Sequence, residues 1–418
     1  MDRVNEVLIV GGGIGGLTLA LELHRRGIAC RVFESAPEIK AVGVGINLLP
    51  HATRVLAELG LEPALARVAV ETADTHFFNR FGQLIYREPL GRRAGYPWPQ
   101  FSIHRGDLQT VLMDAARERL GADRLHLGWH CLGFEQNPDQ HPDHVSLRFQ
   151  DRNPVRGSAA IACDGIHSVM RKQLYPHEGE PKYSGVNMWR GVTRWKPILS
   201  GASMTRAGWL KTGKLVHYPI RNNVGESADG TPLQLVNWLW ELETPQYQRW
   251  DWNRQASVED FIAGARDWHF DWLDVPAFFR AAEVVLEYPM VDKDPLPAWT
   301  FGRVTLLGDA AHPMYPRGSN GAGQAILDGC ALAKCISTSA DLISSLKEYE
   351  MQRLGPTSSV VLENRRSPPD VILREVYERT GDRRFETIGS VITPGELEAL
   401  SDRYKRVAGY DKGALQSR

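Results

Sequence analysis

VLIVGGGIGG, at residues 7–16, is the part of this sequence that most strongly predicts its fold. Four apolar residues run directly into a glycine-rich turn, and an alanine- and leucine-rich amphipathic stretch follows as far as Arg26. Gly27 ends the helical pattern, and a second apolar run covers residues 29–33. A short apolar run, a turn, a helical period and a glycine stop predict a strand, a helix and a second strand, which is one βαβ unit.

The glycines of this turn predict a dinucleotide site. Gly11, Gly13 and Gly16 form the pattern GxGxxG, with Gly15 beside them. Glycine lets the backbone turn tightly and approach a pyrophosphate that is held at a helix N-terminus. Glu34 follows Gly16 by 18 residues, at the end of the second predicted strand, where a carboxylate accepts hydrogen bonds from an adenosine ribose. The motif by itself does not choose between NAD and FAD.

A second turn of the same kind favours FAD. An apolar strand over residues 303–307 is followed by GDAAHP at residues 308–313 and by a predicted helix over residues 321–337. An extended FAD needs one turn for its pyrophosphate and another for its ribityl chain and flavin ring. Asp309 is predicted to bind the ribityl hydroxyls, and the alternative is that it caps the next helix.

A third motif lies between these two. CDGIHSVMR, residues 163–171, follows a predicted strand over residues 159–162. Asp-Gly alone is a common turn dipeptide. The order of the three motifs and their spacing, with the last about 145 residues after the middle one, resemble the para-hydroxybenzoate hydroxylase-type flavoprotein monooxygenases. The resemblance spans about residues 7–350.

Further stretches are similar to the phenazine-modifying branch of that family, the one of the pyocyanin pathway. They are GVGIN (43–47), SIHRG (102–106), MWRGV (188–192) and YPMVD (288–292). Where many relatives have GQG and ED, this chain has Ser319-Asn320-Gly321 and Leu327-Asp328, as the phenazine-type branch does. No equivalent of the substrate-activating tyrosine pair of the hydroxybenzoate enzymes is found, so the resemblance assigns no catalytic base.

The resemblance also implies cofactor contacts. Arg105 is expected to contact the FAD, and Asp164 and Gly165 to serve the pyrophosphate and the encounter with the nicotinamide. Residues 43–46 and 316–321 are expected to line the flavin ring. The named positions within those two segments are Gly45, Ile46, Pro316, Gly318, Ser319, Asn320 and Gly321.

The implied activity is an oxygen transfer. NADH or NADPH reduces the flavin, O2 adds at its C4a carbon, and the resulting hydroperoxide hydroxylates an aromatic or N-heteroaromatic ring, with or without decarboxylation. Backbone amides over residues 318–321 are candidate donors to the departing peroxide oxygen. Two alternatives stay open: a flavin-dependent oxidase or reductase on the same fold, and a non-catalytic FAD-binding protein.

The fold class expected is α/β, with a Rossmann-like FAD-binding domain of the glutathione reductase type, a β-sheet substrate domain and C-terminal helices. Residues 1–71, 99–180 and 290–350 are assigned to a discontinuous FAD domain. Residues 72–98 and 181–289, rich in β-type segments such as 214–220 and 233–239, form the substrate domain. Residues 351–418 are the C-terminal helical segment, for which a charged, solvated surface is expected from Glu363 onward.

The pocket for a flat, carboxylated or hydroxylated ring is expected to draw on aromatic and polar residues of the sheet domain. The candidates are Trp189, Arg190, His217, Tyr218, Trp238 and Tyr315. Arg190, His217 and Tyr218 are also candidates for catalysis, since they can bind a carboxylate or move a proton. For each residue the alternative is a purely structural role, in core packing or in a structural ion pair.

Charge and cysteine content exclude other classes of protein. Lys plus Arg number 49 against 50 Asp plus Glu, so no excess charge favours nucleic acid or a membrane surface. The five cysteines form no CxxC pair and the histidines show no metal-ligand spacing, so we expect a reducing cytoplasm and no metal. Residues 7–10 are too short an apolar run for a signal peptide or membrane span. A monomer or homodimer is expected.

Overall fold

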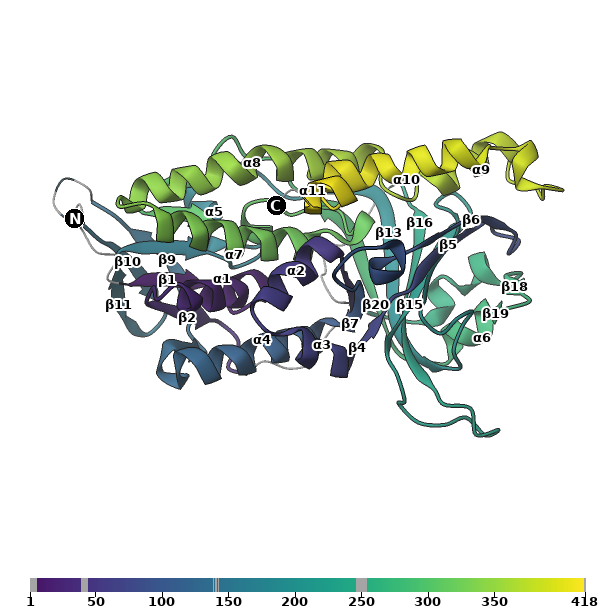
Figure 1. Ribbon diagram of the computed structural model, residues 1–418, viewed down its shortest axis with the longest axis horizontal. Coiled ribbons are helices and arrows are strands. Elements are labelled where there is room, and N and C mark those ends of the chain that lie inside the picture. Colours follow the sequence, from purple (N-terminus) through teal and green to yellow (C-terminus); the bar gives the residue numbers. More distant parts are fainter. Residues whose placement is uncertain are drawn as a thin grey trace.

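The computed structural model describes residues 6–38, 44–137, 139, 141, 143–245 and 254–416. Figure 1 shows two sheets side by side along the long axis, with the helices α8, α10 and α9 running along one edge above both. Within the described residues, no helix has the length and apolar character to cross a bilayer, and no group of three or more metal-ligating side chains occurs.

The first sheet has six strands in the order β21-β22-β12-β1-β2-β8. Their bounds are β1 Val7–Val10, β2 Cys30–Glu34, β8 Leu125–Leu127, β12 Ala159–Ala162, β21 Thr300–Phe301 and β22 Val304–Leu306. All pairs are parallel except β21 with β22. Every residue of β1 and β12 is buried, as expected for parallel strands covered on both faces. The βαβ prediction is confirmed, with α1 (Ile14–Arg25) joining β1 to β2.

The second sheet has eight strands in the order β17-β20-β13-β16-β15-β14-β5-β6. Their bounds are β5 Asp74–Phe78, β6 Leu84–Pro89, β13 Lys182–Trp195, β14 Ser203–Trp209, β15 Gly213–Arg221, β16 Gln234–Glu243, β17 Arg254–Ala256 and β20 Ala282–Asp292. Strands predicted at 214–220 and 233–239 are thus β15 and β16. The α/β fold class, with a second sheet and C-terminal helices, is confirmed.

A three-stranded sheet, β3-β7-β4, joins the two larger ones (Figure 1). Its strands are β3 Gly45–Leu48, β4 Ala69–Glu71 and β7 Phe101–His104. Gly45 pairs with His104 and Ile46 with Ile103, so two of the stretches that resemble the phenazine-type branch are neighbours in space. Helix α4 (Arg105–Leu120) leaves directly from β7, which places Arg105 at a helix start. The remaining small sheets are β9 Cys131–Glu135, β10 Val145–Phe149 and β11 Arg152–Gly157, and β18 His269–Phe270 with β19 Leu273–Asp274.

The remaining helices cover the nucleotide domain or close the chain. They are α2 Pro50–Glu58, α3 Glu62–Val68, α5 Val169–Leu174, α6 Val275–Arg280, α7 Gly321–Thr338, α8 Leu342–Arg366, α9 Val371–Thr380, α10 Pro394–Ala408 and α11 Lys412–Gln416. The tail is helical, as predicted. Its expected solvated character is wrong for one face, because Ile372, Val376 and Leu397 are buried against Phe77 and Ile85 of the second sheet.

The two faces of the second sheet differ because successive side chains of a strand point to opposite sides. Along β15, Val216 and Tyr218 belong to the apolar cluster that faces the nucleotide domain, whereas Leu215 belongs to the cluster on the other face. That second cluster contains α6 and is dominated by aromatic rings.

Three predicted pocket residues lie on this aromatic face. Trp189 stacks on Phe261 with ring centroids 5.3 Å apart, Trp238 packs on Phe279 at 4.5 Å, and the His217 ring lies 6.1 Å from the ring of Phe278. Placing Trp189, His217 and Trp238 in the pocket is therefore wrong. The strand pleat turns their side chains away from the nucleotide domain and into a hydrophobic core.

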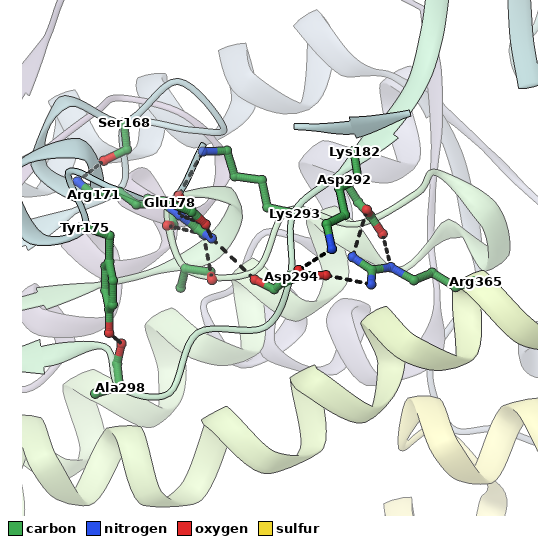
Figure 2. A network of polar contacts seen from close by, with 12 residues as sticks. Ser168, Arg171, Tyr175, Glu178, Lys182, Asp292, Lys293, Asp294, Ala298 and Arg365 are labelled. Atoms are coloured by element: carbon green, nitrogen blue, oxygen red, sulfur yellow. Dashed lines mark hydrogen bonds and ion pairs between the residues drawn. The ribbon is translucent and has the colours of Figure 1, made fainter. Parts of the chain in front are cut away.

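A buried polar network joins the two domains and α8 (Figure 2). Arg171 of α5 is 1% exposed, and its Nη1 donates to the carbonyls of Ala310 and Ala311, each at 2.9 Å. Glu178 accepts from Arg171 and from Lys293, the latter at 2.9 Å. This links the DG motif segment to the backbone of the GD motif.

The same network continues to the end of β20. Asp292 is fully buried and receives the Nε and Nη2 of Arg365 at 2.7 and 2.9 Å, while Nη1 of Arg365 binds Asp294 at 2.9 Å. The chain leaves the second sheet at this point, where β20 ends, and enters the first sheet at β21. The crossing is therefore fixed by paired charges, in addition to the apolar packing of Leu296 and Trp299.

Replacing Arg171 with leucine should lower the free energy of unfolding by about 3–5 kcal/mol, because Glu178 and two carbonyls then lose a buried cationic donor. Thermal melts of the FAD-loaded protein would measure this. Arg93→Leu removes an exposed arginine and should change the melting temperature little. Equal melting temperatures for the two variants would contradict the assignment.

Replacing His217 with leucine should make stability less sensitive to acid. Burial, with a smaller effect of His76, lowers the pKa of His217 to about 3, so between pH 6.5 and about 3 the unfolded chain binds a proton that the folded chain does not. Stability is lost as the pH falls through that window, by about 2 kcal/mol between pH 7 and 5.

Thermal melts at pH 7 and pH 5 would compare the wild type with His217→Leu. The variant should lose less stability than the wild type on acidification, while His24→Leu, an exposed site on α1, should follow the wild type. A variant that loses as much stability as the wild type would refute the effect.

Candidate functional site

A cavity of about 350 Å³ lies between the first sheet and the nucleotide-facing side of the second sheet. The cofactor residues predicted from the sequence that line it are Gly13, Gly15, Gly45, Ile46, Arg105, Gly165, Asp309, Pro316, Gly318, Ser319, Asn320 and Gly321. Segments more than 300 residues apart in the chain therefore meet at one site. Gly43, also predicted to lie there, is outside the described residues.

Two of the predicted glycines support the turn from behind the cavity. A Cβ on Gly16 would lie 2.0 Å from the carbonyl oxygen of Gly11, and a Cβ on Gly11 would lie 2.3 Å from that of Cys163. Gly11 also has a φ of +107°, which favours glycine. In contrast, apart from the adjacent residues of the chain, no described residue places a heavy atom within 4 Å of a Cβ on Gly13 or Gly165, where the backbone borders open space.

Two of the three predicted carboxylates, Glu34 and Asp164, lie outside the cavity wall. Glu34 lies behind the turn, where its Oε2 accepts a hydrogen bond from the Gly12 amide at 2.7 Å. Asp164 Oδ2 accepts from the Val169 amide at 2.9 Å. Its Oδ1 is buried and finds no hydrogen-bond partner within the described part of the chain. Neither side chain is among those that line the cavity.

Two helices begin at this cavity with no side-chain cap. The N-cap residue of α1 is Gly13 and that of α7 is Asn320, and neither bonds its side chain to the first amides of its helix. Free amides and the helix dipole favour negative charge or a carbonyl oxygen at such an end. An FAD fits this donor set, with its pyrophosphate at α1 and the polar edge of its flavin ring at α7.

Asp309 points its carboxylate at the same cavity. It is exposed and lines the wall near α7, and it caps neither the short turn Gly308–Ala310 nor α7. The alternative that Asp309 is a helix cap is therefore wrong.

His312, three residues after Asp309, is buried and bonds Asp328 through Nε2 at 2.5 Å, while Arg353 Nε donates to the same carboxylate at 2.7 Å. Asp328 thus anchors the GD turn.

The loop before α7 has an unusual backbone. Gly318 has a φ of +77° and Ser319, which carries a side chain, a φ of +58°. Asn320 Nδ2 donates to the Gly318 carbonyl at 3.0 Å and to the hydroxyl of Tyr404 at 2.9 Å. A Cβ on Gly318 would lie 1.9 Å from that hydroxyl. Helix α10 therefore fixes the loop in a conformation that costs backbone energy.

Tyr404 was missed at the sequence level. It is buried, donates its hydroxyl proton to Asn364 Oδ1 at 2.6 Å, and has a pKa raised by burial. It lies 84 residues after Asn320, in a helix with no motif, so no local pattern identifies it.

Tyr218 and Arg190, two of the catalytic candidates, hold the segment at Gly45, which lines the cavity. Tyr218 donates its hydroxyl to the carbonyl of Gly45 at 2.8 Å, and Arg190 Nη2 donates to the same oxygen at 3.3 Å. Asn237 accepts from the Gly45 amide at 2.7 Å. Burial raises the pKa of Tyr218 to about 12, so the tyrosine is a hydrogen-bond donor and not a base near neutral pH. Both Tyr218 and Arg190 line the cavity.

Tyr315 is close to the site without lining it. It belongs to the same apolar cluster as Tyr218, but its side chain is not part of the cavity wall. Nearby Asp292 raises the pKa of Tyr315 further, beyond the effect of burial, to about 12. The structure therefore does not place Tyr315 among the lining residues, and its role in the pocket stays a prediction.

The sheet end of the cavity holds a charged group that the sequence did not reveal. Arg206, Glu241 and Asp370 line the wall beside the apolar Met204, Val216 and Leu239. Lys214 lies behind them, with its Nζ 2.6 Å from Glu241, and contacts Asp370, which also pairs with Arg206 at 3.0 Å. Burial would raise the pKa of Asp370, but Lys214 and Arg206 lower it overall.

Comparisons with known proteins agree with this geometry. Residues 5–355 match the family described as FAD binding domain. A phenazine 1,6-dicarboxylic acid hydroxylase of Lysobacter antibioticus is 40% identical over 366 residues, covering 86% of this chain and 89% of that protein. A 3-amino-4-hydroxybenzoate 2-monooxygenase of Streptomyces cremeus is 34% identical, covering 98% and 97%.

Solved structures share the fold at lower sequence identity. A Klebsiella pneumoniae protein in complex with FAD and uric acid has a TM-score of 0.77 at 21% identity, covering 99% of this chain and 98% of that one. A salicylate hydroxylase substrate complex has a TM-score of 0.73 at 24% identity, covering 99% and 97%. The family resemblance and the FAD prediction are thereby confirmed. The chain belongs to the FAD binding domain family and is an FAD-dependent aromatic monooxygenase.

Proposed function

We propose that this monooxygenase hydroxylates a carboxylated, fused N-heteroaromatic ring of the phenazine carboxylate class, with NADH or NADPH as the electron donor. The observation that carries the proposal is the sheet end of the cavity, where Met204, Val216 and Leu239 form an apolar wall beside Arg206 and Arg190. A flat ring packs on such a wall, and a guanidinium binds a carboxylate with two parallel hydrogen bonds. The hydroxylase of Lysobacter antibioticus acts on a ring acid of this kind.

The residues around the flavin have separate tasks in this proposal. The α1 N-terminus binds the pyrophosphate, Glu34 serves the adenosine end, and Asp309 binds the ribityl hydroxyls. Arg105 and the amides over residues 318–321 hold the flavin ring. FAD, when bound, supplies the electron transfer and the activation of O2. The chain itself supplies orientation of the ring acid and exclusion of water.

Neither Tyr218 nor His217 is suited to act as a base for the ring. Tyr218 keeps its proton near neutral pH, and His217 lies on the far face of the sheet. The proposal therefore assigns the residues of the cavity wall to binding and positioning. Simple and decarboxylative hydroxylation share this arrangement and differ in which ring carbon faces the flavin.

We further propose a monomer or homodimer in a reducing cytoplasm. All five cysteines are free thiols, and burial raises the pKa of each of them, which suits a chain that needs no disulfide.

The proposed function is tested by anaerobic reduction of the bound flavin by NADH or NADPH, followed by its absorbance. The panel is phenazine-1,6-dicarboxylate, phenazine-1-carboxylate, 3-amino-4-hydroxybenzoate, 3-hydroxybenzoate and salicylate. We expect the phenazine acids to accelerate reduction at least tenfold over no addition, because a bound ring completes the site. An aerobic run with product mass then separates an added oxygen from loss of CO2.

The other results of this experiment each point elsewhere. Acceleration by a single-ring acid alone would move the substrate to the benzoate class. Fast reduction with no ring acid would favour an oxidase or reductase. Failure to retain FAD would contradict both the monooxygenase and the oxidase or reductase.

Replacing Tyr404 with phenylalanine should uncouple the enzyme. Asn320 and Asn364 lose their shared hydroxyl, so the loop over residues 318–321 becomes less rigid and water reaches the flavin more readily. We expect the share of oxidised NAD(P)H that appears as H2O2 to rise two- to fivefold, with a loss of about 1 kcal/mol in stability. Tyr377→Phe on α9 is the matched control, and an unchanged H2O2 share in Tyr404→Phe would refute the positioning role.

A further inference from the structure

A second, larger cavity of about 480 Å³ adjoins the flavin cavity. Its walls are helices α10 and α11 on one side and strands β5 and β6 with the turn Gly91–Ala94 on the other. These helices lie over that edge of the second sheet in Figure 1. Five aromatic rings line it: Phe77, Tyr86, Tyr96, Tyr404 and Tyr410. Of the sixteen predicted FAD residues, only Gly318 and Ser319 are among its lining residues.

Four residues line both cavities and form a neck between them. They are Met204, Arg206, Gly318 and Ser319. The neck therefore consists of the loop at the flavin ring on one side and a strand of the substrate sheet on the other. A molecule that passes the neck from the second cavity arrives at the apolar wall proposed to hold the ring.

Arg206, the arginine of the neck, is paired with a carboxylate that has a second cation as a partner. Arg206 is 8% exposed, bonds Thr75 Oγ1 through Nη1 at 2.7 Å, and pairs through Nε with Asp370 at 3.0 Å. Asp370 keeps a second cation, Lys214, whether or not Arg206 stays bound to it. An incoming carboxylate can therefore take a share of the guanidinium without leaving Asp370 unpaired.

The outer part of the cavity carries charges of both signs. Lys405 is neutralised by Glu88 at 2.7 Å and Asp402 at 3.1 Å. Arg406 and Lys412 are exposed and make no ion pair with any residue the structure describes, against one exposed acid, Glu398, on the same wall. The Asp411 carboxylate accepts from the Ala414 amide at 3.1 Å.

We propose that this second cavity is an antechamber: it binds the planar aromatic acid first, and the acid then passes the neck at Arg206 to reach the flavin cavity. The inference rests on the proposed function and adds a site and a route to it. A flavin cavity that must exclude water during oxygen transfer needs an access path that the substrate itself fills. Stacking on tyrosine rings and pairing with Arg206 at the neck are the interactions that a flat anion would use there.

The test fills the antechamber without touching the flavin cavity. Ala94 lines only the second cavity and is half-buried, so Ala94→Trp occupies that space. Ala399→Trp, exposed on α10 and lining neither cavity, is the matched control. Stopped-flow flavin fluorescence with phenazine-1,6-dicarboxylate measures the association rate constant in the FAD-loaded enzymes.

We expect Ala94→Trp to lower the association rate constant at least fivefold relative to Ala399→Trp. The flavin reduction rate at saturating ring acid should be unchanged, because the flavin cavity is intact. A fall of less than fivefold, or an equal loss in the reduction rate, would overturn the antechamber.

A chemical block covers the case in which Ala94→Trp does not fold. Ala94→Cys is purified as the holoenzyme and then labelled at pH 7 with a bulky maleimide, with identically treated wild type as the control. Burial raises the pKa of the five native thiols, so the introduced thiol reacts first. The label should slow association at least fivefold in the variant, and equal rates before and after labelling would overturn the proposal.

Failure of the antechamber and failure of the proposed function are distinguishable. If the proposed function fails, no phenazine acid accelerates flavin reduction in the wild type. If only the antechamber fails, the wild type responds to the acid, and the filled or labelled variant binds it as fast as its control.

Discussion

Helices α1 and α7 begin at one cavity with no side chain bonded to their first amides, and the rest of the structure serves to keep them there. Each end carries unsatisfied donors and a partial positive charge, which only a ligand or water can satisfy. The two ends lie more than 300 residues apart in the chain. Their meeting depends on the parallel pairing of β1, β12 and β22, and on Arg171, which binds the carbonyls after the GD turn.

The loops that complete the site are held from outside the nucleotide domain. Gly45 is bound by Asn237, Tyr218 and Arg190 of the second sheet, and the loop before α7 by Tyr404 of α10. The positive φ angle at Ser319 makes that loop costly by itself, so its shape persists because the surroundings fix it. We therefore expect the position of a bound flavin to depend on the second sheet and on the C-terminal helices, although the tail carries no sequence motif.

Buried charge is concentrated at the points where segments join. Asp292 with Arg365, and Asp328 with His312 and Arg353, are pairs whose members come from different parts of the chain. Breaking such a pair is costly although forming it gains little, so these pairs specify one arrangement of the segments. The group of Lys214, Glu241, Asp370 and Arg206 specifies the arrangement of the segments at the cavity itself. Arg206 of this group lies at the neck between the two cavities.

Local sequence patterns were enough to predict the βαβ start, the three nucleotide motifs, the FAD cofactor and the family, because each rests on apolar runs, glycine turns and fixed spacing. Twelve of the residues predicted to bind FAD, from these motifs or from the family resemblance, line the cavity. Which side chains of the second sheet face the ring could be seen only in the folded chain. Adjacent residues such as Arg190 and Trp189, or Tyr218 and His217, point to opposite faces, and which face meets the flavin depends on how the sheets pack. The roles of Tyr404 and Asp370, and the second cavity, likewise depend on contacts between segments that are distant in the chain. No local sequence pattern predicts such contacts.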